Sequence, residues 1–402
     1  MPDSQSDSRP DRPSGSARDL DVVLLGATGF VGRLTAQHLA AHAPADVRWA
    51  VAARSEAALQ RLVADLADHP SPPVASVVVD VTDTTSLDAL AARTRVLATT
   101  VGPYLKYGDA VVGACARAGT DYLDLTGEAE FVDRSWTAHH ATAVESGARL
   151  VHACGFDSVP HDLGAQFTVE QLPSDVPLTV RGVVRSSAAF SGGTYASALN
   201  AMGRMGEARE AARARRAVEQ RPEGRTSRAT APRPHRDPDL GYWLLPLPTV
   251  DPVIVARSGA ALADYGPRFT YSHFAGIRTL KRAVLGGVAV AGLATAAKVP
   301  PLRRQLEKRV PAGSGPSAEK RARSWFTVDF IGEGGGQRVH TRVSGGDPGY
   351  DETAVMLGEA ALCLLRDDNP ETAGQVTTAV AMGPRLRERL ERHGMRFEVI
   401  DS

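Results

Sequence analysis

The stretch "VVLLGATGFVGRLTAQHLA", from Val22 to Ala40, decides the fold. It begins with four apolar residues, a pattern typical of a strand buried on both faces. A turn punctuated by glycines follows, and the remaining residues have the periodicity of a helix. Unpaired N–H groups and the dipole at the start of such a helix favour a bound pyrophosphate. The stretch therefore predicts the first strand–turn–helix unit of a dinucleotide-binding α/β domain.

The glycines of this turn are spaced G-x-x-G-x-x-G, which differs from the regular G-x-G-x-x-G fingerprint. We expect Gly26 to allow the tight turn, Gly29 to let the backbone approach a phosphate, and Gly32 to let the helix pack on the strand. The alternative is a plain glycine-rich turn in an α/β core. The predicted cofactor contacts here are Gly26, Ala27, Thr28, Gly29, Phe30, Val31 and Gly32.

The second predicted strand, residues 47–55, indicates which dinucleotide binds. NAD sites usually carry a carboxylate at the end of this strand, where it binds the ribose 2′-hydroxyl. Here the strand ends in Arg54 and Ser55, and a guanidinium there suits a 2′-phosphate. The sequence therefore favours NADP(H), although Arg54 capping a surface loop is the alternative.

Four further predicted strands alternate with helices up to residue 163. This rhythm indicates a Rossmann-type, doubly wound parallel sheet in an α/β fold. Parallel sheets bind ligands at the carboxyl ends of their strands. The predicted cofactor contacts at these ends are Asp80, Val81, Val101, Gly102, Pro103, Gly127 and Glu128.

The regular alternation of predicted strands and helices ends after residue 163. A longer strand, a long helix, a Pro- and Arg-rich loop at 221–241 and two strands joined at 334–336 predict an inserted α+β second domain. We therefore expect a disordered tail at 1–18 and an NADP-binding domain at 19–163. A substrate and dimerisation domain at 164–345 and a segment returning to the first domain at 346–402 should follow.

Composition excludes several classes of function. The formal net charge is zero and no basic platform is interleaved with aromatic residues, so a nucleic-acid partner is not expected. The three cysteines lack metal-ligand spacing, which argues against a zinc site and for a reducing, cytoplasmic compartment.

The apolar segment 283–297 is shorter than the roughly 20 residues that a membrane-spanning helix needs. A buried or interface helix is one interpretation. The other is peripheral contact with the inner face of the plasma membrane, because Arg278, Lys281 and Arg282 precede the segment and Lys298, Arg303 and Arg304 follow it.

Several blocks in order, among them "GATGFVGRLTAQHLA", "TTVGPYLKYGDAVVGACARAGTDYLDLTGE", "HACGFDSVPHDLGA" and "SGGDPGYDETAVMLGEAALCLL", resemble the saccharopine dehydrogenase-like oxidoreductases. Within that family the chain is most similar to the actinobacterial trans-acting enoyl reductases. The resemblance runs from about Asp21 to Asp368. It implies an NADPH-dependent reductase acting on a double bond in a lipid or polyketide intermediate, including carrier-bound acyl substrates, and contact with membranes in some members.

The catalytic candidates follow the fourth strand. Enoyl reduction needs a hydride, a stabilised enolate oxygen and a proton. Tyr104 and Lys106 are predicted to supply the proton or hold the oxygen, although residues two apart on an extended loop point in opposite directions. Glu128 and Asp157 are expected either to bind the nicotinamide amide or to cap the helices that follow them. The alternatives to a reductase are an NADP(H) sensor or lipid-associated protein without turnover and a saccharopine-type amino-acid dehydrogenase.

Overall fold

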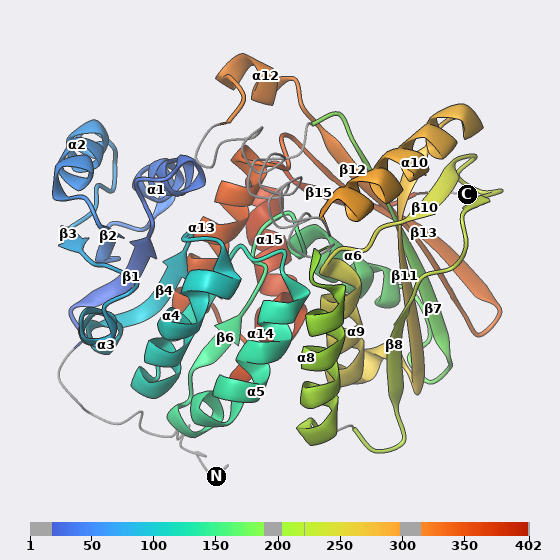
Figure 1. Cartoon of the computed structure of the whole chain (residues 1–402), viewed down its shortest axis with the longest axis horizontal. Helices are drawn as coiled ribbons and strands as arrows, with labels where there is room; N and C mark the ends of the chain where they lie inside the picture. Colours follow the sequence, from blue (N-terminus) through green and yellow to red (C-terminus); the bar gives the residue numbers. More distant parts are fainter. Residues whose placement is uncertain (1–17, 189–202, 221, 298–314, 401–402) are drawn as a thin grey trace, which may run out of the picture.

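The computed structural model describes residues 18–188, 203–220, 222–297 and 315–400. Two sheets stand side by side, and helices cover both faces of the first (Figure 1). The predicted tail at 1–18 and the start of the long helix predicted after residue 197 lie largely outside the described residues.

The first sheet has seven parallel strands in the order β14-β6-β5-β4-β1-β2-β3. The order reverses between β1 and β4, which creates the crevice where doubly wound sheets bind nucleotides. The strands are β1 (Leu20–Leu25), β2 (Trp49–Ala53), β3 (Ala75–Val78), β4 (Thr94–Thr99), β5 (Asp121–Asp124), β6 (Arg149–Val151) and β14 (Gly374–Val376). The predicted doubly wound parallel sheet is confirmed.

Alternate residues of β1 explain why helices pack on both faces. Val22 and Leu24 join one hydrophobic core, whereas Val23 and Leu25 join the other. The first core includes side chains of α1 (Phe30–His42), α2 (Glu56–Leu66) and α13 (Asp351–Arg366). The second includes side chains of α3 (Thr84–Arg93), α4 (Tyr104–Ala118) and α5 (Ala129–Ser146).

The second sheet is mixed, with β15-β13-β12-β7-β11-β10-β9 in order and β8 paired to β11. Helices α6 and α9 carry buried side chains of the same core as this sheet, so the two domains share one continuous hydrophobic interior. The elements are α6 (Val159–Val169), β7 (Leu178–Ser186), α8 (Met205–Val218), β8 (Thr226–Thr230), β9 (His235–Arg236), β10 (Trp243–Pro246), α9 (Asp251–Ala261), a 3₁₀ turn η1 (Ala263–Tyr265), β11 (Arg268–Ile277), α10 (Leu280–Ala297), α12 (Ala318–Ala322), β12 (Phe326–Gly334), β13 (Gln337–Gly345), α14 (Thr378–Ala381), α15 (Gly383–Arg392) and β15 (Arg396–Val399).

One of two predicted details of the second domain is confirmed and the other is wrong. The hairpin predicted around Gly335 is confirmed, since β12 and β13 pair antiparallel on either side of it. The loop predicted at 221–241, in contrast, contains the strands β8 and β9. Their side chains are mostly exposed, so they form strands because β11 and β10 offer backbone partners rather than because of apolar periodicity.

The C-terminal segment serves both sheets. Helix α13 packs on the first sheet as predicted, and β14 adds a strand to that sheet beside β6. β15 then pairs with β13 at the edge of the second sheet. The segment 346–402, expected to return to the first domain, therefore also completes the second.

Glu359 of α13 links three helices in the interior. Its side chain is 2% exposed, and its carboxylate lies 2.7 Å from Nε2 of His38, 3.0 Å from an Arg389 nitrogen and 3.0 Å from Nε2 of His393. Burial alone would raise the pKa of this carboxyl, but the hydrogen bonds from both histidines outweigh burial and lower it.

We expect Glu359→Gln to reduce the free energy of unfolding by about 2 kcal/mol at pH 7, because His38, His393 and Arg389 lose hydrogen bonds to a buried charged group. A carboxyl with a lowered pKa in the folded state stabilises above its unfolded pKa and loses that contribution as the pH falls. The difference between wild type and variant should therefore shrink between about pH 4.5 and pH 3 in urea titrations. A difference that does not change with pH would contradict this role.

Candidate cofactor and active site

The glycine turn between β1 and α1 is built for close backbone contact. Gly26 has φ +86°, and a Cβ there would lie 2.7 Å from Oγ1 of Thr100. A Cβ on Gly32 would lie 2.3 Å from the carbonyl oxygen of Gly26, whereas one on Gly29 would meet only that oxygen, at 3.3 Å. The positive φ of Gly26 fits the tight turn predicted for it, whereas Gly32 lets α1 approach the turn at Gly26 and Ala27 rather than the strand. The space beside Gly29 suits a phosphate.

The rest of this turn differs in exposure. Ala27 is buried, Thr28 and Val31 are half-buried, and Phe30 packs edge-on against Tyr350 with ring centroids 4.8 Å apart. Gly315 lies over the Phe30 ring, since a Cβ there would come within 2.5 Å of it. The chain before α12 therefore contacts the edge of the predicted phosphate site.

Arg54 and Ser55 lie just after β2, as predicted. Arg54 is exposed, and its positive charge lowers the pKa of Asp80, although less than the two hydrogen bonds that Thr82 donates to Asp80. Ser55 is the N-cap of α2, and its hydroxyl accepts from the Ala58 N–H at 3.3 Å. Val81 is buried, Asp80 accepts hydrogen bonds from Thr82, and Ser55 caps α2. Arg54 is therefore the most accessible of these groups for binding a 2′-phosphate.

The catalytic candidates lie in the first turn of α4 rather than on the extended loop we expected. Tyr104 is buried, and its hydroxyl donates to the Thr99 carbonyl and accepts from the Leu125 N–H, each at 3.1 Å. Burial, followed by the charge of Asp124, raises the pKa of Tyr104. Lys106 is exposed. The tyrosine thus holds β4 and β5 together, and the lysine is the more accessible of the two.

The predicted turn residues before α4 remain open to ligand. Gly102 and Pro103 are exposed, and Val101 is half-buried. After β5, Gly127 is half-buried, and Glu128 Oε2 accepts from the Leu105 N–H at 2.8 Å. Glu128 therefore caps the start of α4, the helix before it, whereas its side chain makes no capping hydrogen bond to α5, the helix that follows it.

Asp124 and His152 form a buried polar pair that holds the backbone directly after β6 in place. The sequence did not predict this pair. Nδ1 of His152 lies 2.6 Å from Oδ2 of Asp124, and Oδ1 of Asp124 accepts from the Ala153 N–H at 2.8 Å. Ala153 has φ +60°, a strained value for a residue with a Cβ. Asp157 follows on this turn, and burial raises its pKa to about 6. Only the positions of Asp124 and His152 at adjacent strand ends could have signalled the pair.

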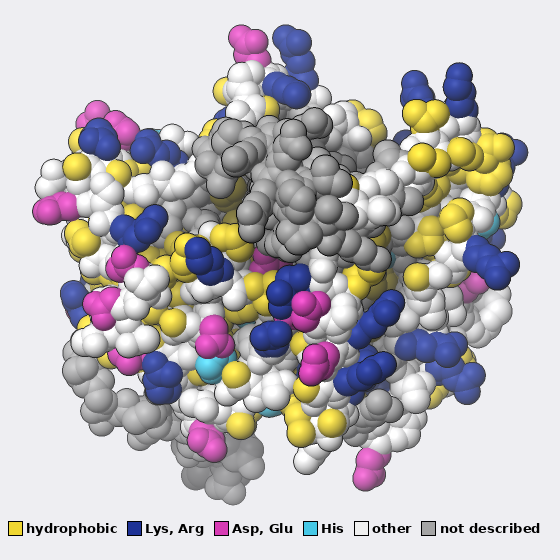
Figure 2. Space-filling model, in the orientation of Figure 1, with side chains coloured by type: hydrophobic (Ala, Val, Ile, Leu, Met, Phe, Trp, Pro, Cys, Tyr) yellow, Lys and Arg dark blue, Asp and Glu magenta, His cyan; other side chains and the backbone are white. Residues whose placement is uncertain are grey.

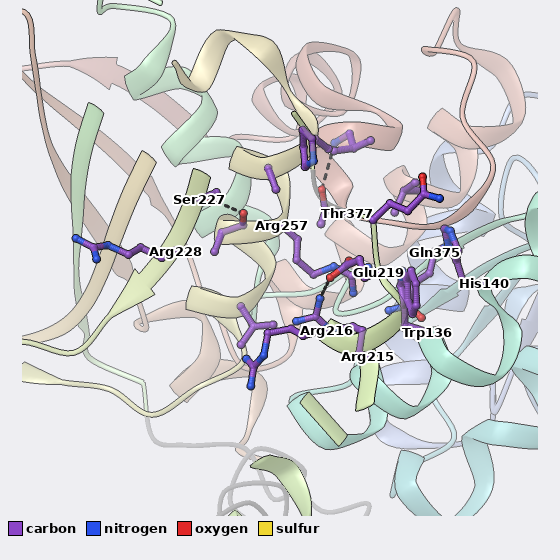
Figure 3. A pocket seen from close by; sticks show the side chains of 18 of the residues that line it. Trp136, His140, Arg215, Arg216, Glu219, Ser227, Arg228, Arg257, Gln375 and Thr377 are labelled. Carbon is purple, nitrogen blue, oxygen red and sulfur yellow. Dashed lines mark hydrogen bonds and ion pairs between the residues drawn. The ribbon is translucent and has the colours of Figure 1, made fainter. Parts of the chain in front are cut away.

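A separate pocket of about 1340 Å³ lies where the two domains meet (Figure 3). Its walls come from α5, α8, β8, α9 and β14, and none of the predicted cofactor contacts lines it. Arg215 pairs with Glu219 and, at 2.6 Å, with Asp133, while Arg257 lies 3.6 Å from Glu219. Arg215 and Arg257 thus have acidic partners within the protein, while Arg216, Arg225, Arg228 and Arg268 add positive charge to the lining.

Comparison with known proteins shows which proteins this chain is similar to. The family model of the saccharopine dehydrogenase NADP-binding domain matches residues 22–151. The chain is 39% identical to a Mycobacterium tuberculosis protein whose name proposes a trans-acting enoyl reductase, over 96% of this chain and 98% of that one. It is 36% identical to the trans-acting enoyl reductase of Mycobacterium bovis, over 95% and 98% of the two chains. The apo saccharopine dehydrogenase (L-Glu forming) of Saccharomyces cerevisiae shares the fold at TM-score 0.54 and 13% identity, over 95% of this chain and all of that chain.

Proposed function

The chain belongs to the family of trans-acting enoyl reductases, whose first domain is a saccharopine dehydrogenase NADP-binding domain, and from this premise we propose that it reduces an enoyl double bond with NADPH. The observation that carries the proposal is the glycine turn, which leaves room for a pyrophosphate beside Gly29. Arg54, exposed at the end of β2, supplies the cation for the 2′-phosphate. The chain is thus an NADP-dependent oxidoreductase.

We assign the two catalytic candidates different roles. When bound, NADPH supplies the hydride that adds to the β carbon of the enoyl group. Lys106, exposed in the first turn of α4, stabilises the developing enolate oxygen or delivers the proton to the α carbon. Tyr104, whose hydroxyl is engaged by two backbone groups, is a positioning residue that keeps this turn in place.

Oxidation of NADPH by the purified protein in the presence of enoyl thioesters tests the function, with mass spectrometry of the saturated product. We expect Lys106→Met to lower kcat by about 100-fold, the usual size of a general acid contribution. Lys320→Met is the matched control, because Lys320 is exposed on α12. Tight NADPH binding with no oxidation by any enoyl thioester would favour the sensor alternative.

The relatives' names describe reductases that act in trans. We therefore propose that the substrate is an acyl group presented on a carrier, as in lipid or polyketide assembly. A homodimer through the second domain and a cytoplasmic location stay predictions.

Peripheral membrane contact through α10 is a further part of the proposal. No helix among the described residues is both long and apolar enough to cross a bilayer. Gly286 and Gly287 pack α10 against β11 and β10, whereas Leu280, Val284, Leu285 and Val288 are 50–68% exposed. These exposed side chains support membrane contact over burial within this chain, and an interface helix stays the alternative prediction. Figure 2 shows the apolar patch, with Lys and Arg beside it; Lys298, Arg303 and Arg304 lie outside the described residues.

We expect the double variant Val284→Glu, Leu285→Glu to lower binding to vesicles of anionic phospholipid by at least about tenfold, because two apolar side chains leave the lipid and two negative charges meet it. Vesicle sedimentation measures this. Val74→Glu is the control, since Val74 is 59% exposed before β3, on the other sheet. Equal binding by wild type and both variants would remove α10 from the membrane contact.

A further inference from the structure

Three side chains from distant parts of the chain meet in the interior beyond the exit of β6. His161 lies in the first turn of α6, Asp251 begins α9, and His273 lies in the middle of β11. All three are buried, with side chains at most 4% exposed. Their ligand atoms lie within 4.8 Å of one another. The cluster therefore joins the end of the first domain to a helix and a strand of the second.

Several polar atoms of this cluster lack good hydrogen bonds within the protein. Nε2 of His161 is 3.3 Å from Oδ1 of Asp251, yet that oxygen has no hydrogen-bond partner, and neither has Nδ1 of His161. Nε2 of His273 is 3.8 Å from Oδ2 of Asp251, too far for a hydrogen bond. Buried polar atoms without partners cost free energy, so a native structure that contains them needs an explanation.

The orientation of His273 supports a ligand between these groups. Its Nδ1 lies 3.1 Å from the hydroxyl of Tyr271, which leaves Nε2 directed toward Asp251. Metal-bound histidines are typically held in this way, with the second ring nitrogen bonded to a neighbouring polar group. Tyr271 is itself buried, which fixes the pair.

The chemistry of the three side chains also favours a cation. Each imidazole can offer a nitrogen lone pair and Asp251 can offer a carboxylate oxygen, so all three are ligands for one metal ion.

We infer that His161, Asp251 and His273 form a binding site for a divalent transition-metal ion of the zinc class. Two imidazole nitrogens and one carboxylate oxygen are a ligand set that zinc accepts, whereas calcium and magnesium prefer oxygen alone. Small rotations of the rings bring the three atoms to bonding distance of one ion. The ion would tie α6, α9 and β11 together and fix the junction of the two domains.

Metal content and cobalt spectroscopy test this inference independently of enoyl reduction. The full chain is produced in zinc-supplemented medium, purified without metal-affinity steps and analysed by mass spectrometry for metals. We expect about one zinc ion per chain. After removal of zinc by a chelator, added Co²⁺ should give the visible absorption bands of a four-coordinate site with nitrogen ligands, and the chelated protein should melt at a lower temperature.

His273→Ala and Asp251→Asn should each abolish the cobalt bands and the effect of the chelator on melting. His393→Ala is the matched control, because His38, His42 and His393 form the other histidine group among the described residues, nearer the surface. Absence of stoichiometric metal and of cobalt bands in the wild type would overturn the inference. The inference would also be overturned if His393→Ala lost the cobalt bands while Asp251→Asn kept them. That outcome can be measured as long as these two variants fold.

Discussion

Gly32→Ala should lower NADPH affinity by about 100-fold, the largest effect we expect from a single methyl group, corresponding to about 3 kcal/mol. The added Cβ would lie 2.3 Å from the carbonyl oxygen of Gly26 and 2.9 Å from Cα of Ala27. Both are backbone atoms, so neither can rotate away. The turn must shift, and with it the backbone N–H groups that face the pyrophosphate.

Fluorescence titration with NADPH and urea unfolding measure the two consequences, which are loss of affinity and loss of stability. Gly206→Ala is the control, because a Cβ on Gly206 meets nothing within 4 Å and the residue lies in the first turn of α8. There the substitution should change stability by less than about 1 kcal/mol and leave NADPH binding intact. Normal NADPH affinity in Gly32→Ala would show that the phosphates bind elsewhere.

Arg54→Ala should weaken NADPH binding by about 10- to 100-fold while leaving NADH binding nearly unchanged, because a charge-assisted hydrogen bond to the 2′-phosphate is lost. The discrimination should fall at high salt, since Arg54 is exposed and its charge is screened.

Arg61→Ala controls for general loss of positive charge, because Arg61 is exposed in the middle of α2, whereas Arg54 precedes that helix at the end of β2. Parallel titrations with NADPH and NADH give the ratio of the two affinities for each variant. A ratio in Arg54→Ala equal to that of the wild type would assign the 2′-phosphate to another cation.

The parts of the fold with local signals could be predicted from the sequence. Apolar runs followed by glycines located β1 and its turn, and three glycines in succession located the β12–β13 hairpin. β8 carries mostly exposed side chains in an Arg- and Pro-rich stretch, so only its partner β11 makes it a strand. Pro103 looked like the middle of a loop, but it is the N-cap of α4 and places Tyr104 inside the helix.

The polar clusters of the interior were beyond sequence reasoning for a different reason. Asp124 ends β5 and His152 follows β6, and at the end of a strand capping or solvent contact is the ordinary expectation. His161, Asp251 and His273 are separated by long stretches of chain and share no spacing typical of metal ligands. Only the crossing of α6, α9 and β11 brings them together, and no local pattern encodes that crossing.

The position of β14 and β15 has a consequence for how the protein is made. Both sheets receive an edge strand from residues that are far along the chain, at 374–376 and 396–399. Because a ribosome synthesises the chain from its N-terminus, the first sheet is complete only after residue 376 has emerged and the second only after residue 399. Until then, one edge of β6 and one edge of β13 have unpaired backbone groups. Such exposed edges can pair with other chains and cause aggregation, or can be bound by chaperones. The two sheets are therefore completed within one short stretch of synthesis, rather than one long before the other.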